Sequence, residues 1–294
     1  MNGFLIIDKP EGWTSFDIVA KVRRITGIKK IGHTGTLDPM ATGVMVLMLG
    51  RTAKLLNYLQ DTDKRYTASV KLGARTDTLD KTGSIVATSQ RSVNIGDIKR
   101  AMAKFIGEIE QVPPMYSAVK KDGVRLYDLA RQGKEVHREK RKVRINSINL
   151  LSFDEQNQRL ILDIDCSSGT YIRTLADDLG EILGTYAHLC ALRRTSACGF
   201  DENVSVKIDD ISASEPFKHV IAADTAFKSC SAAYVSPAQS VRLINGGWLD
   251  INRVDIKDSS MSELVRIYDG DGFLGLGNVD IKNGNLKPAC IIRI

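Results

Sequence analysis

The sequence predicts an α+β protein that ends in a small β-rich domain, and three observations support this fold class. Helix-like and strand-like periodicities are mixed along roughly the first 200 residues, without internal repeats or low-complexity tracts. Residues 201 to about 232 show no clear period and carry much Ser and Pro, which favours a linker. The remaining stretch of about 60 residues has strand patterns joined by Gly-rich turns, which is typical of an independent module.

The first helix is predicted to begin at Thr14 or Ser15, because either side chain can cap it, and to end at Gly27. Its apolar side chains recur at helical spacing and are Phe16, Ile18, Val19, Val22 and Ile25. The segments expected next are a loop over 27–35, a short buried strand over 44–49 and a helical segment over 52–59.

Strands and helices continue through the middle of the chain. Alternating or continuous apolar patterns predict strands over 65–74, 143–153 and 159–166, and a helix is expected over 95–107. In the small domain the expected elements are a helix over 239–247 and strands within 263–281 and 289–294.

A further helix is predicted just after residue 171. Its apolar face is made of Ile172, Leu175, Leu179, Ile182 and Leu183. Gly184 is expected to end it, because glycine adopts the left-handed conformation that closes many helices. Tyr171 and Arg173 are therefore expected at a strand-to-helix junction.

Composition excludes several classes of protein. Hydrophobic residues make up 43% of the chain and charged residues 26%, which is ordinary for a globular protein and argues against disorder. No apolar run approaches the roughly 18 residues of a membrane span, and the beginning of the chain is too short and acidic for a signal peptide. A cytoplasmic protein without a membrane partner is expected.

The cysteines point to neither a disulfide framework nor a zinc site. There are five, an odd number, and no CxxC spacing occurs. They are expected to be buried thiols, and no metal site is predicted. Phosphate-loop, dinucleotide-loop, HExxH and GxSxG motifs do not occur either.

The net positive charge is concentrated in one segment. Lys and Arg number 41 against 35 acids, a formal charge of +6, and residues 120–144 alone hold ten basic and four acidic side chains. A basic run is often only a solvated face. Here Leu126, Leu129 and Ala130 give a short helical face and Tyr127 adds an aromatic ring, so a partly folded projection that meets phosphates is predicted.

The stretch GHTGTLDPMATG, residues 32–43, carries a single carboxylate, Asp38. Before Pro39 this aspartate can be an ordinary turn residue. Its neighbours suggest more, because glycines allow unusual backbone angles and close approach of a ligand, while hydroxyls can fix a carboxylate in one rotamer. These neighbours are Gly32, Gly35, Gly43, Thr34, Thr36 and Thr42. A carboxylate so presented can act as a nucleophile at an electrophilic carbon.

This stretch, extended to GHTGTLDPMATGVMVLMLG, closely resembles the catalytic motif of the TruB family of pseudouridine synthases, which act on uridine 55 of bacterial tRNA. The resemblance covers most of residues 4–200. It continues in the blocks LIIDKPEGWTSFD, TDKRYTASVKLGARTDTLD, QVPPMYSAVKKDGVRLYDLARQGKEV, CSSGTYIRTLADDLG and HLCALRRT. The block ACGFDENVSV departs from the family's commoner Gly-Pro-Phe ending.

The resemblance implies a catalytic domain over 1–232, with a mixed, largely antiparallel sheet of the pseudouridine synthase type and flanking helices. It also implies a PUA-like RNA-binding domain over 233–294, supported by FLGLGNVD and NLKPACII. The implied reaction is isomerisation of a uridine in the T-loop of tRNA to pseudouridine, after the base is flipped out, without cofactor or metal. A monomer that needs no protein partner is expected.

The resemblance also assigns catalytic residues. Asp38 matches the family's catalytic aspartate. The sequence leaves open whether this carboxylate attacks the sugar, attacks the base or removes a ribose proton. Arg173, otherwise an ordinary surface charge, matches the arginine paired with that acid and is expected to keep it ionised. Tyr66, otherwise a half-buried strand tyrosine, matches the tyrosine that stacks on the target base.

Other matches concern binding and support. Tyr171 and Leu192 match residues that line the uracil pocket, although core packing alone would explain them. His33, which by itself would be incidental, matches a histidine that contacts the RNA and helps hold the flipped nucleotide. Lys9 and Pro10 match a block beside the active site and are expected to support it without touching substrate.

The basic projection corresponds to the family's insertion over about 115–143, which grips the T-loop. Phosphate contacts from it are expected to supply affinity and position without reading bases. The residues expected to make these contacts are Arg138, Lys140, Arg141 and Lys142.

Two other functions remain open at this stage. One is a non-catalytic RNA-binding or tRNA-folding protein whose catalytic loop is vestigial, against which the intact Asp38, Tyr66 and Arg173 speak. The other is a glycoside hydrolase using Asp38, which requires a partner acid about 5 to 10 Å away. Asp77 and Asp80 are the candidates for that acid.

Overall fold

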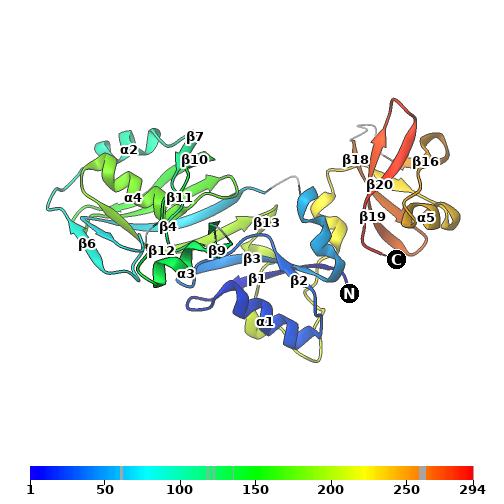
Figure 1. The fold of residues 1–294 in the computed structure, drawn as a ribbon, viewed down its shortest axis with the longest axis horizontal. Coiled ribbons are helices and arrows are strands. Elements are labelled where there is room, and N and C mark those ends of the chain that lie inside the picture. The colour runs from blue at the N-terminus through cyan, green and yellow to red at the C-terminus, as the bar shows by residue number, and fades with distance from the viewer. Residues whose placement is uncertain (60–61, 118, 122, 135, 258–262, 294) are drawn as a thin grey trace.

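The computed structural model describes residues 1–59, 62–117, 119–121, 123–134, 136–257 and 263–293. Within them the chain forms a ten-stranded sheet, a separate six-stranded sheet and two small hairpins (Figure 1). The ten-stranded sheet is mixed but largely antiparallel, because only the β1–β14 and β3–β12 pairs run parallel. The predicted fold class is thereby confirmed.

The strands of the large sheet follow the order β14-β1-β3-β12-β4-β11-β10-β7, with β2 beside β3 and β13 beside β12. Their bounds are β1 Gly3–Lys9, β2 Ile31–His33, β3 Ala41–Leu49, β4 Lys64–Leu72, β7 Gly107–Gln111, β10 Arg141–Asp154, β11 Arg159–Cys166, β12 Ala187–Ala197, β13 Phe200–Asp201 and β14 Val206–Lys207. The strands predicted over 44–49, 65–74, 143–153 and 159–166 are all present.

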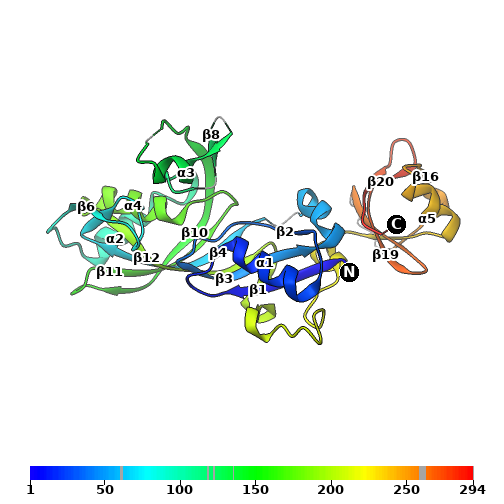
Figure 2. The ribbon, with the colours of Figure 1, turned by 60° about the horizontal axis from the view of Figure 1, so that its bottom comes forward.

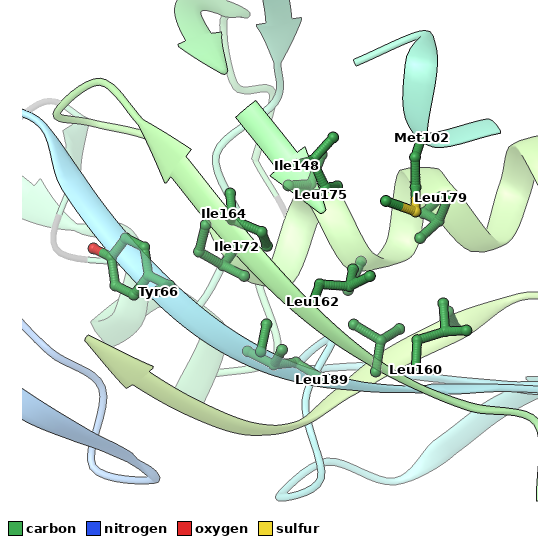
Figure 3. Close-up of a cluster of buried hydrophobic side chains, with 14 of the residues drawn as sticks. Tyr66, Met102, Ile148, Leu160, Leu162, Ile164, Ile172, Leu175, Leu179 and Leu189 are labelled. Carbon is green, nitrogen blue, oxygen red and sulfur yellow. The ribbon is translucent and has the colours of Figure 1, made fainter. Parts of the chain in front are cut away.

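Helices α2 (Ile95–Ala103) and α4 (Ile172–Leu183) cover one face of the sheet (Figure 1). Figure 3 shows the core between them, where side chains of α4 and α2 meet those of β11 and β12. The helix predicted to end at Gly184 is confirmed, and Gly184 closes it with φ of 69°. Ile182 departs from the predicted apolar face, since 42% of its surface is exposed.

Helix α1 (Ser15–Thr26) packs against the other end of the sheet. Thr14 caps it with a reciprocal hydrogen-bond pair to Asp17, and Gly27 ends it, as predicted. Phe16 is the exception on its apolar face, because it lies outside the buried stripe and is 69% exposed. The expected loop over 27–35 is wrong in part: β2 pairs there with the end of β3, which supplies hydrogen-bond partners that sequence periodicity does not reveal.

The helical segment expected over 52–59 is a 3₁₀-type helix, η1 (Gly50–Tyr58). The two small hairpins are β5 (Ala74–Thr76) with β6 (Ile85–Thr88), and β8 (Lys120–Lys121) with β9 (Val124–Arg125).

Residues 201–232 do not form an exposed linker. The segment contains short elements, and β14 extends the large sheet. Ile208 and Ile211 are buried in a core of the large sheet, and Ala223 and Phe227 are buried in a cluster that the two sheets share. The prediction failed because these apolar residues follow no regular period, so only tertiary packing reveals their role. The short elements are η2 (Glu202–Val204), η3 (Ile208–Asp210) and η4 (Ala223–Phe227).

The six-stranded sheet has the order β16-β20-β19-β18-β15-β17. Its bounds are β15 Ala232–Tyr234, β16 Leu249–Asp250, β17 Asp255–Lys257, β18 Leu264–Asp269, β19 Gly272–Asp280 and β20 Asn285–Ile291, with α5 at Pro237–Ile244 and η5 at Ile251–Arg253. The helix and strands predicted for this region are therefore present. The domain boundary at 232 and the PUA-like character stay predictions.

The small sheet contacts the large one. The Tyr58 hydroxyl donates to the carbonyl of Ala289 at 2.8 Å, and Asn2 Nδ2 donates to the carbonyl of Ile292 at 3.2 Å. Leu276 of the small sheet and Ile292, the residue after β20, share a buried cluster with Phe4.

The basic segment contains the β8–β9 hairpin and α3 (Leu126–Arg131), and Figure 2 shows both rising from the large sheet. Leu126 is buried, whereas Tyr127 is 42% exposed. A partly folded projection is therefore present. Elsewhere, the described helices include none that is long and apolar enough to cross a membrane.

Candidate active site

A cavity of about 320 Å³ opens between the loop that carries Asp38, strand β4 and the beginning of α4. It collects residues that are far apart in the sequence, and five of the predicted site residues are among them: Asp38, Tyr66, Tyr171, Arg173 and Leu192. Its lining comprises Thr34 to Asp38, Lys64, Tyr66, Ser117, Ser168 to Arg173, Leu192 and Arg194.

The backbone on both sides of Asp38 is held by hydrogen bonds. The Ser15 hydroxyl accepts from the Leu37 amide at 2.9 Å and donates to the Leu37 carbonyl at 3.2 Å. On the other side, Lys9 Nζ donates to the Pro39 carbonyl at 3.3 Å. The aspartate is therefore presented by a loop that is fixed at its neighbours, which leaves its carboxylate for contacts in the cavity.

The sequence predicted only some of the groups that hold this carboxylate. Among the described residues, its hydrogen-bond donor is Arg173, and none of Thr34, Thr36 and Thr42 bonds to it. Of the three nearby glycines only Gly43 has a left-handed φ, of 97°. Thr34 and Thr36 lie on the same loop and Thr42 lies on β3, but the carboxylate turns toward α4, where the charged Arg173 is available.

Arg173 forms the centre of a charged network. Its Nε lies 2.9 Å from Asp38 Oδ2, and its Nη1 lies 3.6 Å from Asp80 Oδ2. The same guanidinium donates to the carbonyls of Tyr116 at 2.8 Å and Thr78 at 3.2 Å. Because Arg173 is only 5% exposed and its donors are largely engaged, it holds Asp38 in one orientation.

Burial raises the pKa of the Asp38 carboxyl above its ordinary value, while Arg173 pulls it down and Asp80 pushes it up. About a third of the Asp38 side chain, 34%, still faces the open cavity. The predicted ion pair is present, but it offsets the cost of burial only in part.

Tyr66 and Leu192 lie on neighbouring strands that form one wall of the cavity. Tyr66, on β4, is 6% exposed, and burial raises the pKa of its hydroxyl. Figure 3 places it at the end of the buried cluster, with the hydroxyl pointing away from Ile164 and Ile172. Leu192 is 8% exposed and lies on β12, which pairs with β4. An aromatic face and an aliphatic side chain suit a flat base.

Tyr171 lines the cavity at the N-terminal end of α4, as the junction predicted. Gln111 fixes it by accepting from its amide at 3.0 Å and donating to its carbonyl at 3.3 Å. His33 lies one residue before the lining begins, on β2, and burial lowers the pKa of its imidazole. The cavity therefore brings together the predicted pocket residues, with His33 beside it.

Lys9 is fully buried and its ammonium donates to three carbonyls: Pro10 at 2.9 Å, Trp13 at 2.7 Å and Pro39 at 3.3 Å. Burial lowers the pKa of Lys9 to about 8. Lys9 thus links the backbone of Pro10 to the backbone of the residue after Asp38 through hydrogen bonds. Neither Lys9 nor Pro10 lines the cavity. A supporting role for both stays a prediction.

The four basic residues expected to contact phosphates lie away from the cavity. Lys140 pairs with Glu110 at 3.4 Å, and both side chains are mostly exposed. Arg138 is half-buried and donates to the carbonyl of Pro113 at 3.1 Å. Arg141 and Lys142 begin β10 and are exposed.

Sequence reasoning missed Lys64 and Arg194, which both line the cavity and are 8% and 0% exposed. The signal was their spacing: each lies two residues from a recognised pocket residue on the same strand, Lys64 before Tyr66 and Arg194 after Leu192. Side chains two apart in a strand share a face, so both were candidates for the same wall.

All five cysteines are free; Cys166, Cys198 and Cys230 are buried, as expected, whereas Cys190 and Cys290 are partly exposed. The described residues contain no group of three or more His, Cys, Asp or Glu able to hold a metal ion.

A glycoside hydrolase needs a second acid in the cavity. Among the described residues lining it, Asp38 is the one carboxylate. Asp80 pairs with Arg173 and accepts bonds from the Thr78 and Thr82 hydroxyls, while Asp77 accepts from the amide of Ser84 in an exposed turn. Neither candidate lines the cavity.

Comparison with solved structures bears out the fold. The chain superposes on a structure titled as an H/ACA RNP bound to a substrate RNA containing 2′-deoxyuridine, with TM-score 0.73 and 20% identity, covering 99% of this chain and 85% of the other. A Cbf5–Nop10–Gar1 complex gives TM-score 0.70 and 24% identity, covering 94% and 78%. This chain therefore shares its fold, a mixed sheet with flanking helices, with these solved structures.

Sequence comparison is more specific. Residues 23–172 match the family model described as the N-terminal domain of TruB family pseudouridylate synthase, and residues 173–228 match that of the tRNA pseudouridylate synthase B C-terminal domain. A protein named tRNA pseudouridine synthase B from Clostridium perfringens (strain 13 / Type A) is 42% identical over 293 residues, 99% of each chain. Its namesake from Aliivibrio fischeri (strain MJ11) is 38% identical, over 99% of this chain and 95% of the other. The chain belongs to the TruB family of pseudouridine synthases.

Proposed function

We propose that this protein isomerises a uridine in the T-loop of tRNA, uridine 55, to pseudouridine. The observation that carries the proposal is the Arg173–Asp38 ion pair at a cavity of about 320 Å³ in a chain of the TruB family. The proposed reaction uses groups of this chain and invokes neither cofactor nor metal. The proposed setting is a cytoplasmic monomer that acts on the T-arm.

The reaction exchanges one bond of the ribose for another. The bond from C1′ to N1 breaks, the detached uracil turns in the cavity, and its C5 bonds to C1′. A base within a structured loop must first leave its stack to reach Asp38. In this proposal Tyr66 stacks on the base, Tyr171 and Leu192 line its pocket, and His33 helps hold the flipped nucleotide.

The catalytic group is Asp38, positioned by Arg173. Three chemical steps are open to Asp38: attack on the sugar, attack on the base, or removal of a ribose proton. The geometry of the protein without substrate is compatible with each. Arg138, Lys140, Arg141 and Lys142 supply phosphate contacts in the proposal, and the PUA-like domain extends the contact along the tRNA.

The test is nucleoside analysis by mass spectrometry, with chemical mapping, on an unmodified tRNA transcript treated with wild type, Asp38→Asn and Asp209→Asn. Asp209 is exposed and lies outside the cavity, so its variant controls for a lost carboxylate. Pseudouridine at one T-loop uridine is expected with wild type and Asp209→Asn and absent with Asp38→Asn. If Asp38→Asn makes pseudouridine, Asp38 is not the essential catalytic group.

The same experiment separates the alternative of a non-catalytic RNA-binding or tRNA-folding protein. Such a protein binds the transcript but leaves its nucleosides unchanged in all three samples. A binding measurement on each sample therefore accompanies the nucleoside analysis.

A further inference from the structure

Two buried cations, Lys64 and Arg194, meet beneath the loop that carries Asp38. A Cβ placed on Gly35 would lie 3.8 Å from Lys64 Nζ and 3.6 Å from Arg194 Nη1, so both charged groups converge on that glycine. Both line the cavity, although Arg194 is fully buried and Lys64 is 8% exposed. They form a distinct pair of charges, separate from the Arg173 network.

No carboxylate neutralises this pair among the ion pairs of the described residues. Arg194 donates to two carbonyls, those of Val44 at 2.6 Å and Gly35 at 3.2 Å, and its Nη1 has no hydrogen-bond partner in the described part of the chain. Lys64 Nζ donates to the carbonyl of Thr62 at 3.4 Å. Arg173, by contrast, is matched by Asp38 and a second acid.

Burying cations without counter-charges costs folding free energy. Arg194 repels its neighbours, and this repulsion helps burial to lower the pKa of Lys64. A buried polar group without a hydrogen-bond partner in the protein is explained if a bound ligand supplies that partner. The ligand indicated here is one that carries negative charge within the cavity.

The position of the pair relative to Tyr66 says which part of the substrate this is. Lys64 and Tyr66 are two residues apart on β4 and therefore share a face. Arg194 is the register partner of Tyr66 across the β12–β4 ladder. A ring stacked on Tyr66 thus lies beside both cations.

The uracil ring becomes negative in each of the three routes open to Asp38. When the C1′–N1 bond breaks, by attack on C1′ or after loss of a ribose proton, its electron pair stays on the ring and spreads to O2 and O4. When the carboxylate attacks C6, the electrons of the C5–C6 double bond move toward O4. In every case the ring loses its negative charge when C5 bonds to C1′. To complete the reaction, the bond from Asp38 to C1′ or C6 breaks again, or the ribose proton is returned, while the C5 proton leaves and N1 is protonated.

We propose that Lys64 and Arg194 stabilise this negative charge on the uracil ring, and so lower the barrier to the exchange of its glycosidic bond. The inference rests on the proposed function. Fixed charges aimed at a site where charge develops are effective because they need no rearrangement during the reaction. The free-energy cost of burying two cations is incurred when the protein folds, before the substrate binds.

The test compares Lys64→Met, Lys64→Arg and the control Lys71→Met, which removes a lysine of the same strand outside the cavity. Single-turnover rates of pseudouridine formation and Kd for a T-arm RNA are measured for each. We expect Lys64→Met to slow the reaction by about 100-fold or more while Kd changes by less than about threefold. Lys64→Arg should recover part of the rate, and Lys71→Met should resemble wild type.

Thermal unfolding separates this role from a structural one. Since Lys64 is a buried cation beside another, Lys64→Met should unfold at the same temperature as wild type or higher. A wild-type rate for Lys64→Met would overturn the inference, and so would a weaker Kd with an unchanged rate, which would assign Lys64 to a phosphate. Equal slowing in Lys64→Arg together with lower unfolding temperatures would also overturn it. Failure of wild type itself to make pseudouridine would instead refute the proposed function.

Discussion

Arg173 and Asp38, which are 135 positions apart in the sequence, are joined by two contacts: Nε to Oδ2 at 2.9 Å and Nη2 to Oδ1 at 3.2 Å. The arrangement is bidentate, so it fixes the plane of the carboxylate as well as its position. The arginine comes from the first turn of α4 and the aspartate from the loop before β3.

Removing Arg173 should damage both stability and activity. Arg173→Met leaves Asp38 and the buried Asp80 without their cation, and breaking a buried pair in this way costs about 3 kcal/mol of unfolding free energy. Pseudouridine formation should fall by about 100-fold or more, because the carboxylate loses its fixed orientation. Urea unfolding and single-turnover assays measure the two effects.

The matched control is Arg193→Met. Arg193 pairs with Asp8 at 3.0 Å outside the cavity, and both side chains are partly exposed. Its loss should cost about 0 to 1 kcal/mol and leave the reaction rate unchanged. Equal effects of the two substitutions would contradict the role given to Arg173.

Gly43 should not tolerate a side chain. Its φ is 97°, and a Cβ there would lie 2.2 Å from the backbone oxygen of Arg194. Gly43→Ala must therefore push β3 away from β12, and we expect a loss of about 3 kcal/mol in unfolding free energy.

Gly27→Ala is the comparison for Gly43, because Gly27 has φ of 70° with nothing within 4 Å of the added Cβ. It tests backbone strain without overlap and should cost about 1 to 2 kcal/mol. Chemical denaturation of both variants checks the difference. A smaller loss for Gly43→Ala than for Gly27→Ala would show that the close approach to Arg194 is unimportant.

The basic segment should control the salt dependence of tRNA binding. Replacing Arg138, Lys140, Arg141 and Lys142 by Ala should weaken binding and flatten the plot of log K against log salt, by about 0.9 for each phosphate that the protein no longer neutralises. Arg141→Ala with Lys142→Ala should produce much of this change, since these two side chains are exposed and are not engaged in the ion pair that holds Lys140.

Titration of tRNA at several salt concentrations measures that slope. The control is Lys21→Ala with Arg23→Ala on α1, two exposed or half-exposed basic residues in another part of the molecule. A slope that stays unchanged in the quadruple variant would move the phosphate contacts to another surface.

Lys9 should make stability depend on pH in the alkaline range. Burial lowers the pKa of Lys9 from 10.5 to about 8 in the folded protein, so between these values the unfolded chain binds more protons and wild-type stability gains from rising pH. In Lys9→Met this gain is absent. The unfolding free energy of wild type minus that of Lys9→Met should therefore rise between pH 8 and 10.5.

Urea unfolding of both proteins across that range measures the difference, with Lys71→Met as the control. Other groups that titrate there affect wild type and variant alike and cancel. A difference that stays constant with pH would mean that Lys9 keeps its ordinary pKa.

Local sequence determined much of the fold. Thr14 and Gly27 define α1, and Gly184 ends α4, because caps act through hydrogen bonds and backbone angles within a few residues. Alternating apolar residues likewise predicted the central strands. The motif around Asp38 identified the family directly, since its residues are contiguous.

Only the tertiary structure decided which groups surround Asp38. The threonines beside it in sequence do not hold it; Arg173 does. Strand spacing made Lys64 and Arg194 candidates for the same wall, but only the folded chain shows that they meet beneath Asp38. The packing of residues 201–232 was hidden for the same reason. Periodicity and capping report interactions within a few positions, whereas these contacts join segments that are brought together only when β3, β4 and β12 pair.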